Sequence, residues 1–310
     1  MMKKKDVLIA LLLVVIWGVN FTVIKLGLSG VPSMLLVTLR YLLTVFPAIF
    51  FIKKPNTEWK YIILYGLAVG VGQFSCLFYA MEIGMPAGIS SIILQIQAFI
   101  SPVLAMIFLN EKLKAKQIVG SIIAAAGLVI IAISNTTGGI GSIPFTAILL
   151  NLLAPFFWAA SNIVARIASD KSAAKGEKLD MFSLVVWSSL IPPIPMLGLA
   201  LILDTPQTLL SVVTNLSGIS IFAIIYLAFG ATLLGYGIWS VLIGKYPMGK
   251  IAPLPLLVPV IALMSARIVL NEQLSSMQWL GVSVILLGLI ITTINPEIIM
   301  KHLKKVGHEL

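Results

Sequence analysis

The sequence has very few charged residues for its length. Charged side chains make up 10% of the 310 residues, apolar side chains make up 59%, and the mean hydropathy is +1.08. Soluble domains carry roughly 25% charged residues, so the composition excludes an ordinary soluble protein and predicts a polytopic membrane protein. The net charge of +10 does not indicate a nucleic-acid partner, because the lysines lie in short clusters between apolar runs and form no basic face.

Cysteine and histidine are almost absent. Cys76 stands alone inside an apolar segment, so no intramolecular disulfide can form. His302 and His308 both lie in the C-terminal tail, 301–310. Metal sites and Cys/His catalytic sites need several such side chains close together. We therefore expect no metal, no cofactor and no enzymatic activity.

Acidic side chains are missing from the interior of every long apolar run. Proton-coupled carriers often place a carboxylate inside the membrane, where desolvation raises its pKa into the working range. Glu82, Asp204 and Glu272 instead fall in predicted outer loops, and the other acids fall on or near the inner surface. No intramembrane coupling acid is identified, and coupling through an acid at a helix end stays open.

Ten apolar runs approach the roughly 20 residues that cross a bilayer as a helix. They fall at about 7–28, 33–52, 60–81, 88–109, 116–133, 144–167, 181–203, 218–243, 250–270 and 277–295. Lysines occur before the first run and at 53–60, 112–116, 171–178, 245–250 and 301–305, and they are absent from 29–32, 82–87, 134–143, 204–217 and 271–276. By the positive-inside rule, this alternation places both termini in the cytoplasm.

A pattern in the first half of the chain recurs in the second half at a fixed offset. Pro86-Ala-Gly88 recurs as Pro247-Met-Gly249, and Asn110-Glu111 recurs as Asn271-Glu272, in each case 161 positions later. A constant offset over such a length indicates two related units. Because each unit then holds five runs, an odd number, the second must be inverted in the membrane.

The predicted fold is therefore all-α, with ten transmembrane helices in two inverted five-helix repeats. The predicted boundaries are 1–140 and 141–300, followed by the tail 301–310. Inverted repeats are typical of secondary transporters, in which one unit rocks against the other around a site near the midplane. Channels and membrane enzymes can also be duplicated, so the repeat alone does not decide the function.

Several short motifs resemble a known family. They are Trp17-Gly-Val-Asn-Phe21, Pro86-Ala-Gly88, the two Asn-Glu turns and the glycine-containing runs 117–128 and 278–289. Together they resemble the drug/metabolite transporter superfamily, specifically its ten-helix EamA type, over nearly the whole chain. The longer runs 17–25, 84–99 and 226–239 are most similar to members that export O-acetylserine and cysteine.

The resemblance implies export of small polar metabolites from the cytoplasm across a bacterial inner membrane, through a cavity between the two halves. O-acetylserine, cysteine or related amino acids are the substrates that it suggests, with alternating access as the mechanism. Small multidrug relatives depend on a buried glutamate, and its absence here is evidence against antiport of cationic drugs. A broader amino-acid or drug exporter of the same fold, a membrane-embedded enzyme and a non-transporting scaffold are the alternatives. The oligomeric state stays open.

Arg40 is the charged residue inside a predicted span. It lies about eight residues into the second run, so about 10 Å below the predicted outer boundary. A charge at that depth normally faces a partner or a water-filled cavity, and a guanidinium suits the carboxylate of a substrate. The alternative is that Arg40 reaches outward or binds carbonyls at a broken helix end.

Lys25 and Arg166 are candidate mouth residues, because each follows a tryptophan, Trp17 or Trp158, by eight positions. The inversion would put these cations at opposite ends of a path, where they suit an anionic or zwitterionic substrate. They can equally be ordinary helix-end cations.

Buried amides and aromatic rings are the other candidate substrate contacts. Asn20 shares a helix face with Trp17, and Asn162 shares one with Trp158. An amide inside a bilayer needs a partner, so each either binds substrate or joins helices. Gln95 and Gln97 point in different directions, so at least one of the two packs against another helix.

Aromatic side chains and prolines complete the predicted site. Tyr236 and Trp239 share a face with Thr232 and could hold an ammonium group by cation–π attraction, or could simply pack. Pro102 and Pro259 interrupt corresponding runs, which is a pattern of hinges and midplane sites. They could also merely curve the helices. We expect Asn110 and Asn271 to be N-caps of the helices that follow them, with Glu111 and Glu272 in the first turn.

Overall fold

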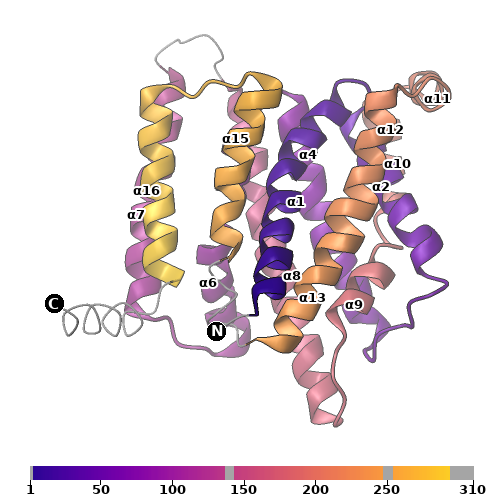
Figure 1. The fold of residues 1–310 in the computed structure, drawn as a ribbon, viewed down its shortest axis with the longest axis vertical. Helices are drawn as coiled ribbons and strands as arrows, with labels where there is room; N and C mark the ends of the chain where they lie inside the picture. Colours follow the sequence, from indigo (N-terminus) through magenta and orange to yellow (C-terminus); the bar gives the residue numbers. More distant parts are fainter. Residues whose placement is uncertain (1–2, 137–142, 247–253, 294–310) are drawn as a thin grey trace.

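The structure is a computed structural model that describes residues 3–136, 143–246 and 254–293. Every regular element within these ranges is a helix (Figure 1), which confirms the predicted all-α class. The N-terminal part, 3–136, contains α1 (Lys4–Leu28), α2 (Ser33–Ala48), α3 (Trp59–Tyr65), η1 (Gly66–Gln73), α4 (Phe74–Glu82), α5 (Ala87–Leu94), α6 (Gln97–Leu109) and α7 (Ala115–Thr136). The C-terminal part, 143–293, contains α8 (Phe145–Ala174), α9 (Met181–Ser188), α10 (Pro193–Leu203), α11 (Pro206–Thr214), α12 (Gly218–Ile225), η2 (Tyr226–Leu234), α13 (Gly235–Lys245), η3 (Leu254–Leu257), α15 (Val258–Leu270) and α16 (Ser276–Thr293).

Each of the ten predicted apolar runs coincides with helix where the chain is described. Within the described ranges, five helices are long and apolar enough to cross a membrane: Lys4–Leu28, Trp59–Glu82, Ala87–Leu109, Phe145–Ala174 and Gly218–Leu242. The bent pair α9 and α10, at 41° to each other, becomes a sixth if it is counted as one span. Shorter apolar helices occupy Ser33–Ala48, Ala115–Ile131, Val258–Leu270 and Ser276–Thr292. Predictions that fall on 137–142, 247–253 and 294–310 lie outside the described residues.

The first helix of each part packs against the other part. Helix α1 lies against α15, α12, η2 and α13, and α8 lies against α4, η1, α5 and α6. Both helices stand inside the group of helices and not at its edge (Figure 1). Because each of these helices packs against the other part, the interface between the two parts is extensive.

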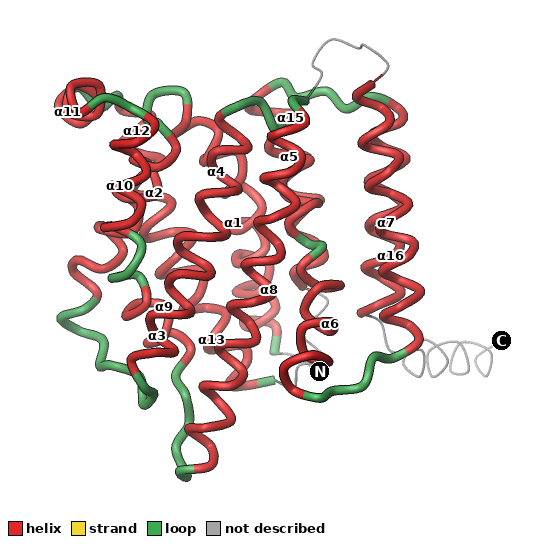
Figure 2. Tube along the Cα trace, turned by 180° about the vertical axis from the view of Figure 1, so that it is seen from behind, coloured by secondary structure: helices red, strands yellow, loops and turns green. Residues whose placement is uncertain are grey.

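Helices α7 and α16 form a close pair at one side of the molecule, as the two opposite views both show (Figures 1 and 2). Glycines make the close approach possible. A Cβ atom added to Gly127 would lie 2.7 Å from the carbonyl oxygen of Gly281, and one added to Gly288 would lie 2.6 Å from that of Gly120. Small residues at helix interfaces let backbones approach inside a membrane in this way.

Irregular turns recur at matching places in the two parts. The π-helical segment η1 matches η2 at almost the same offset as the sequence motifs. The break between α5 and α6, at Gln95 and Ile96, similarly matches the end of the 3-10 turn η3. The expected interruption of the paired Pro102 and Pro259 runs is therefore present, although it falls before each proline.

The predicted N-caps at Asn110 and Asn271 are wrong. Both asparagines have left-handed backbone conformations, with φ of 55° and 53°, and they end the preceding helices α6 and α15. Asparagine tolerates this conformation better than most residues and therefore suits a helix C-terminus. The following helices begin only at Ala115 and Ser276.

Residues 204–217, which the sequence predicted as a loop, contain the short helix α11. The Thr205 hydroxyl accepts a hydrogen bond from the backbone N–H of Thr208 at 3.2 Å and so caps this helix. Leu209 is buried, whereas Leu210 is exposed. The helix therefore packs by one apolar side at a corner of the molecule (Figure 1).

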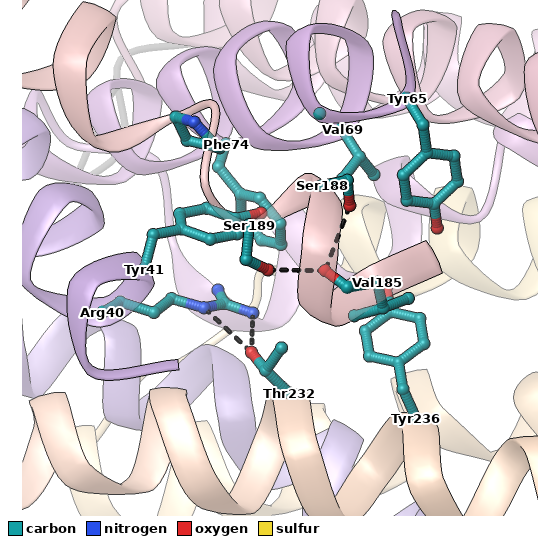
Figure 3. A pocket seen from close by; sticks show the side chains of 12 residues that line it. Arg40, Tyr41, Tyr65, Val69, Phe74, Val185, Ser188, Ser189, Thr232 and Tyr236 are labelled. Carbon is teal, nitrogen blue, oxygen red and sulfur yellow. Dashed lines mark hydrogen bonds between the residues drawn. The ribbon is translucent and has the colours of Figure 1, made fainter. Parts of the chain in front are cut away.

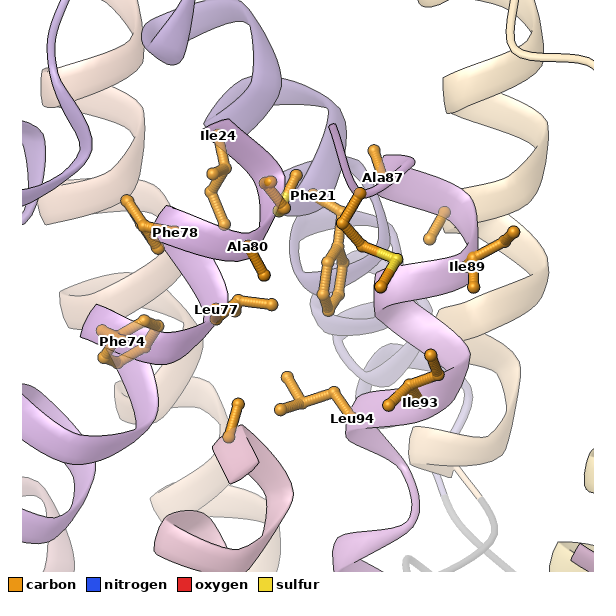
Figure 4. Packing of buried hydrophobic residues seen from close by; sticks show 14 of the residues in the cluster. Phe21, Ile24, Phe74, Leu77, Phe78, Ala80, Ala87, Ile89, Ile93 and Leu94 are labelled. Atoms are coloured by element: carbon orange, nitrogen blue, oxygen red, sulfur yellow. The ribbon is translucent and has the colours of Figure 1, made fainter. Parts of the chain in front are cut away.

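The interior is filled by aliphatic and aromatic side chains that include Phe21, Leu77, Phe78 and Ile93 (Figure 4). The exterior is also apolar. Ile194, Phe145 and Ile268 are each more than 70% exposed, at 81%, 77% and 74%. Large apolar side chains on the outside fit a surface that faces lipid rather than water.

Candidate functional site

Four segments of the chain surround a small cavity that holds Arg40 (Figure 3). Its lining comes from α2 (Arg40, Tyr41), from α3, η1 and α4 (Tyr65, Gly66, Val69, Phe74), from the α9–α10 bend (Val185, Ser188, Ser189, Pro192) and from η2 and α13 (Thr232, Tyr236). The cavity volume is about 10 Å³, which is room for about one water molecule. An amino acid does not fit, so the cavity has to open before it can take one.

The π-helical turns explain why these segments meet here. A π turn widens the helix locally, and such turns often occur at functional sites. Gly66 in η1 lies so close to the α9–α10 bend that a Cβ atom would come within 2.6 Å of the Ser188 carbonyl oxygen. On the other side, Thr232 in η2 donates to the carbonyl oxygen of Leu227, five residues back, at 2.8 Å. Residues of both matched π-helical segments therefore line the same cavity.

Arg40 is only 3% exposed and has no carboxylate partner within 4.0 Å among the described residues. Its Nε and Nη2 both donate to the hydroxyl of Thr232, at 3.3 and 2.9 Å, and its Nη1 has no hydrogen-bond acceptor in the described chain. The guanidinium carbon lies 4.1 Å from the ring centre of Phe74 and 5.6 Å from that of Tyr41. A single neutral acceptor does not offset the free-energy cost of burying a cation. The guanidinium is therefore suited to bind an anion that enters the cavity.

Three of the predicted aromatic residues meet beside this cavity. The ring of Trp17 lies 5.5 Å from that of Tyr236 and 5.8 Å from that of Trp239. The indole N–H of Trp17 donates to the backbone oxygen of Ala231 at 3.1 Å. Since Tyr236 also lines the Arg40 cavity, the aromatic cluster Trp17–Tyr236–Trp239 is continuous with it.

Two of the predicted amides meet elsewhere, between α6 and α8. The Asn162 side chain donates to the Gln97 side-chain oxygen at 3.1 Å, and the hydroxyl of Ser101 donates to the same oxygen at 3.2 Å. Gln97 is therefore the glutamine that packs against another helix. Gln95 is 5% exposed at the α5–α6 break, and the side-chain oxygen of Asn20 is buried without a partner in the described chain. The structure does not place these four residues in the wall of the Arg40 cavity.

The remaining candidates lie apart from the cavity. The ammonium of Lys25 donates to the carbonyl oxygens of Met81 and Met85, at 2.5 and 3.4 Å. Arg166 is exposed and pairs with Asp170 at 3.2 Å and with Glu111 at 3.7 Å. Trp158 in α8 packs against two hydrophobic clusters, one of which contains Tyr65 and Val69.

The two prolines differ in their surroundings. Pro102 lies inside α6, and Pro259 lies buried in the first turn of α15. A proline in a first helical turn costs no hydrogen bond, whereas one in a helix interior removes one. Pro102 therefore weakens its helix and Pro259 does not.

Sequence reasoning missed most of the cavity wall. Ser188, Ser189 and Pro192 lie within one long apolar run, where the pair Pro192–Pro193 was the available signal for a bend. The hydroxyls of Ser188 and Ser189 both donate to the Val185 carbonyl, at 3.0 and 2.7 Å, and so close the end of α9 (Figure 3). Phe74 carried no signal of its own, because an aromatic side chain in an apolar run is usually packing.

Several known proteins with similar sequences are named as transporters or efflux pumps. The EamA-like transporter family matches the chain twice, over residues 4–133 and 145–294. A protein of Escherichia coli (strain K12) named "Probable amino-acid metabolite efflux pump" is 40% identical over 290 residues, which cover 94% of this chain and 95% of that protein. A protein of the same name from Salmonella typhimurium is 41% identical over 290 residues, with the same coverage.

The fold is also similar to a known one. A solved crystal structure superposes with a TM-score of 0.61 over 94% of this chain and 97% of that chain, at 13% sequence identity. At this identity the likeness concerns the fold alone. The double family match and the 40% identity over nearly the full length carry the assignment: the chain belongs to the EamA-like transporter family, and it is a multi-pass membrane protein.

Proposed function

We propose that this protein exports small amino-acid-like metabolites that carry a carboxylate, with O-acetylserine and cysteine as the leading candidates. The observation that carries this proposal is the buried Arg40 guanidinium. Within the described part of the chain it is hydrogen-bonded only to the Thr232 hydroxyl, and its Nη1 has no acceptor. The names of the two relatives that are 40% and 41% identical support the class of substrate.

In this proposal Arg40 binds the substrate carboxylate and the neighbouring rings bind the ammonium. A guanidinium offers two parallel N–H donors to a carboxylate. None of the described residues that line the cavity is an acid, so an ammonium group would rest against the aromatic cluster Trp17–Tyr236–Trp239 by cation–π attraction. Gln95, Asn20 and the Gln97–Asn162 pair would line the path further along.

The proposed architecture has ten spans in two inverted repeats, at 1–140 and 141–300, followed by a cytoplasmic tail at 301–310. The two family matches, the matched π segments and the matched left-handed asparagines support it. Transport would proceed by alternating access, with one repeat rocking against the other. The breaks before Pro102 and Pro259 would absorb the bending, and Lys25 and Arg166 would lie near the two mouths.

The proposed location is a bacterial inner membrane with both termini in the cytoplasm, as the lysine pattern indicates. The partners are then a small-molecule substrate and the lipid bilayer. A broader amino-acid or drug exporter of the same fold is the second candidate, because the relatives' printed names state no single metabolite.

The experiment is uptake of radiolabelled O-acetylserine and cysteine by liposomes that hold the purified protein, with and without a pH gradient. Arg40→Lys keeps the charge but loses the paired donors, and Arg40→Ala loses both. We expect Arg40→Ala to abolish uptake and Arg40→Lys to weaken substrate affinity on the order of 10- to 100-fold, because hydrogen bonds to a charged group contribute about 1.5–3 kcal/mol.

Arg267→Ala is the matched control, since this arginine is exposed near the end of α15. Full uptake by Arg40→Ala would remove Arg40 from the substrate site. A competition series with other amino acids and with cationic drugs separates the narrow exporter from the broad one. Uptake that follows the substrate gradient alone would indicate a facilitator, and uptake that needs the pH gradient would indicate proton coupling.

A further inference from the structure

The carboxylate of Glu272 joins the two parts of the chain at one end of the molecule. This end, called here the lysine-poor end, carries the connecting segments 29–32, 83–86, 204–217 and 271–275. Oε1 of Glu272 accepts a hydrogen bond from the backbone N–H of Ala87 at 2.7 Å, and Oε2 accepts one from Gly88 at 3.0 Å. Glu272 follows α15 in the C-terminal part, whereas Ala87 and Gly88 begin α5 in the N-terminal part.

The N-terminus of α5 is a favourable place for a negative charge. The first N–H groups of a helix have no acceptor within the helix, and the helix dipole adds partial positive charge there. Gly88 lets α15 come close, because a Cβ atom at this position would lie 2.8 Å from Cδ2 of Leu263. The carboxylate is thus held by the helix dipole as well as by two hydrogen bonds.

The equivalent residue at the opposite end has the same backbone but different partners. Glu111 and Glu272 each follow a left-handed asparagine, and their backbone N–H groups donate to Ala105 and Ala266 at 3.3 Å in both cases. Among the described residues, the Glu111 carboxylate pairs with Arg166 at 3.7 Å, and both side chains are more than half exposed. Exposed pairs of this kind contribute about 0–1 kcal/mol, so the contacts of the two equivalent glutamates differ in strength.

A second acid at the lysine-poor end, Glu82, caps a helix without joining the two parts of the chain. Glu82 accepts hydrogen bonds from the Ser33 backbone N–H at 3.2 Å and from the Ser33 hydroxyl at 2.6 Å. It therefore also holds a helix N-terminus, that of α2. Both of its partners, however, belong to the N-terminal part, so Glu82 does not connect the two parts.

We propose that Glu272 is the latch that keeps the lysine-poor end shut, and that substrate leaves at this end only after the carboxylate detaches from Ala87 and Gly88. This inference rests on alternating access as put forward under the proposed function. Glu272 acts here as a positioning residue, because it controls the approach of α5 and α15 and touches no substrate in the Arg40 cavity.

The test is chemical labelling from the lysine-poor side, without substrate. Ser91 is fully buried and lies three residues after Gly88 on the same face of α5, so a cysteine there reports opening between α5 and α15. The reporter is Ser91→Cys in a chain whose own cysteine is removed by Cys76→Ser. A membrane-impermeant maleimide is added to liposomes with the lysine-poor end outside. We expect Glu272→Gln to raise the labelling rate about tenfold or more, because Gln lacks the charge and has one acceptor oxygen instead of two.

Glu82→Gln and Glu111→Gln are the matched controls, and both should label at the parental rate. Glu272→Asp keeps the charge on a shorter side chain and should label at an intermediate rate, which a general loss of folding would not produce. Parental labelling of Glu272→Gln, or equal acceleration by Glu82→Gln, would overturn the latch. Because labelling needs no substrate, a chain that shows the contrast but transports nothing would reject the proposed substrate and retain the latch.

Discussion

Arg40 meets a hydroxyl where a buried guanidinium usually meets a carboxylate. The Thr232 hydroxyl accepts hydrogen bonds from two of the Arg40 nitrogens and donates one to the carbonyl oxygen of Leu227. This acceptor is neutral, so a substrate carboxylate would be the stronger partner and could displace it. At the residue scale, the site therefore consists of the Arg40 cation and a weak, neutral hydrogen-bond partner, Thr232, that a substrate carboxylate could replace.

Replacing Thr232 with valine tests this arrangement without changing the shape of the side chain much. Thr232→Val leaves Nε and Nη2 of Arg40 without their acceptor, so we expect the free energy of unfolding to fall by about 1–3 kcal/mol. Thermal unfolding in detergent measures the loss. Thr38→Val is the matched control, because Thr38 is equally buried and its hydroxyl donates only to Met34 of its own helix. Equal shifts for the two variants would mean that Thr232 does not compensate Arg40.

The candidate residues divided into two groups that local sequence could not separate. Arg40, Tyr236 and Trp17 meet around the cavity, whereas Gln97 and Asn162 bind each other between α6 and α8. The sequence identifies polar and aromatic side chains in apolar runs, and it orients them within their own helix. It does not say which helix lies opposite, because that depends on packing between segments far apart in the chain.

At the scale of elements, the pairing of α7 with α16 depends on the absence of side chains. Gly127 faces the carbonyl oxygen of Gly281, and Gly120 faces that of Gly288. Two helices cannot approach this closely if a methyl group stands between them. The glycines recur in the sequence at a fixed offset, and the structure shows that they let α7 and α16 approach closely.

A single methyl group should disturb this pair. The Cβ atom of Gly127→Ala would lie 2.7 Å from both the Gly281 oxygen and Cγ1 of Ile285, so we expect a loss of roughly 1–3 kcal/mol in unfolding free energy. Gly198→Ala in α10 is the control, since nothing lies within 4 Å of its added Cβ atom. That variant should gain about 0.5–1 kcal/mol, because alanine is the better helix former. Unfolding curves in which Gly127→Ala is as stable as the parent would show that the helix pair can separate freely.

At the scale of the whole molecule, carboxylates join the two parts at both ends. Glu272 binds the start of α5 at the lysine-poor end. At the other end, buried Asp6 accepts from the Tyr246 hydroxyl at 2.6 Å and from Lys245 at 3.2 Å, which ties α1 to α13. Contacts at both ends agree with the small volume of the Arg40 cavity, and under the proposed alternating access they correspond to an occluded state.

The orientation of the whole molecule can be tested by labelling in cells. Single cysteines at Ser29 and Asn215 should react with a reagent that cannot cross the inner membrane, and cysteines at Lys53 and Glu177 should react only after permeabilisation. All four positions are exposed, and Cys76→Ser supplies the background. This result follows from the positive-inside rule applied to the lysine pattern. The reverse pattern would invert the proposed direction of export.

The sequence by itself determined the all-α class, the ten apolar runs and Arg40 as a cation buried within one of them. These features follow from composition and local hydropathy, which act on each segment separately. Only the tertiary structure decided that Arg40 meets Thr232, 192 positions away, and that Glu272 caps α5 and not its own following helix. Hydrogen bonds between distant segments depend on how helices pack and where they break, and neither is encoded in a local pattern.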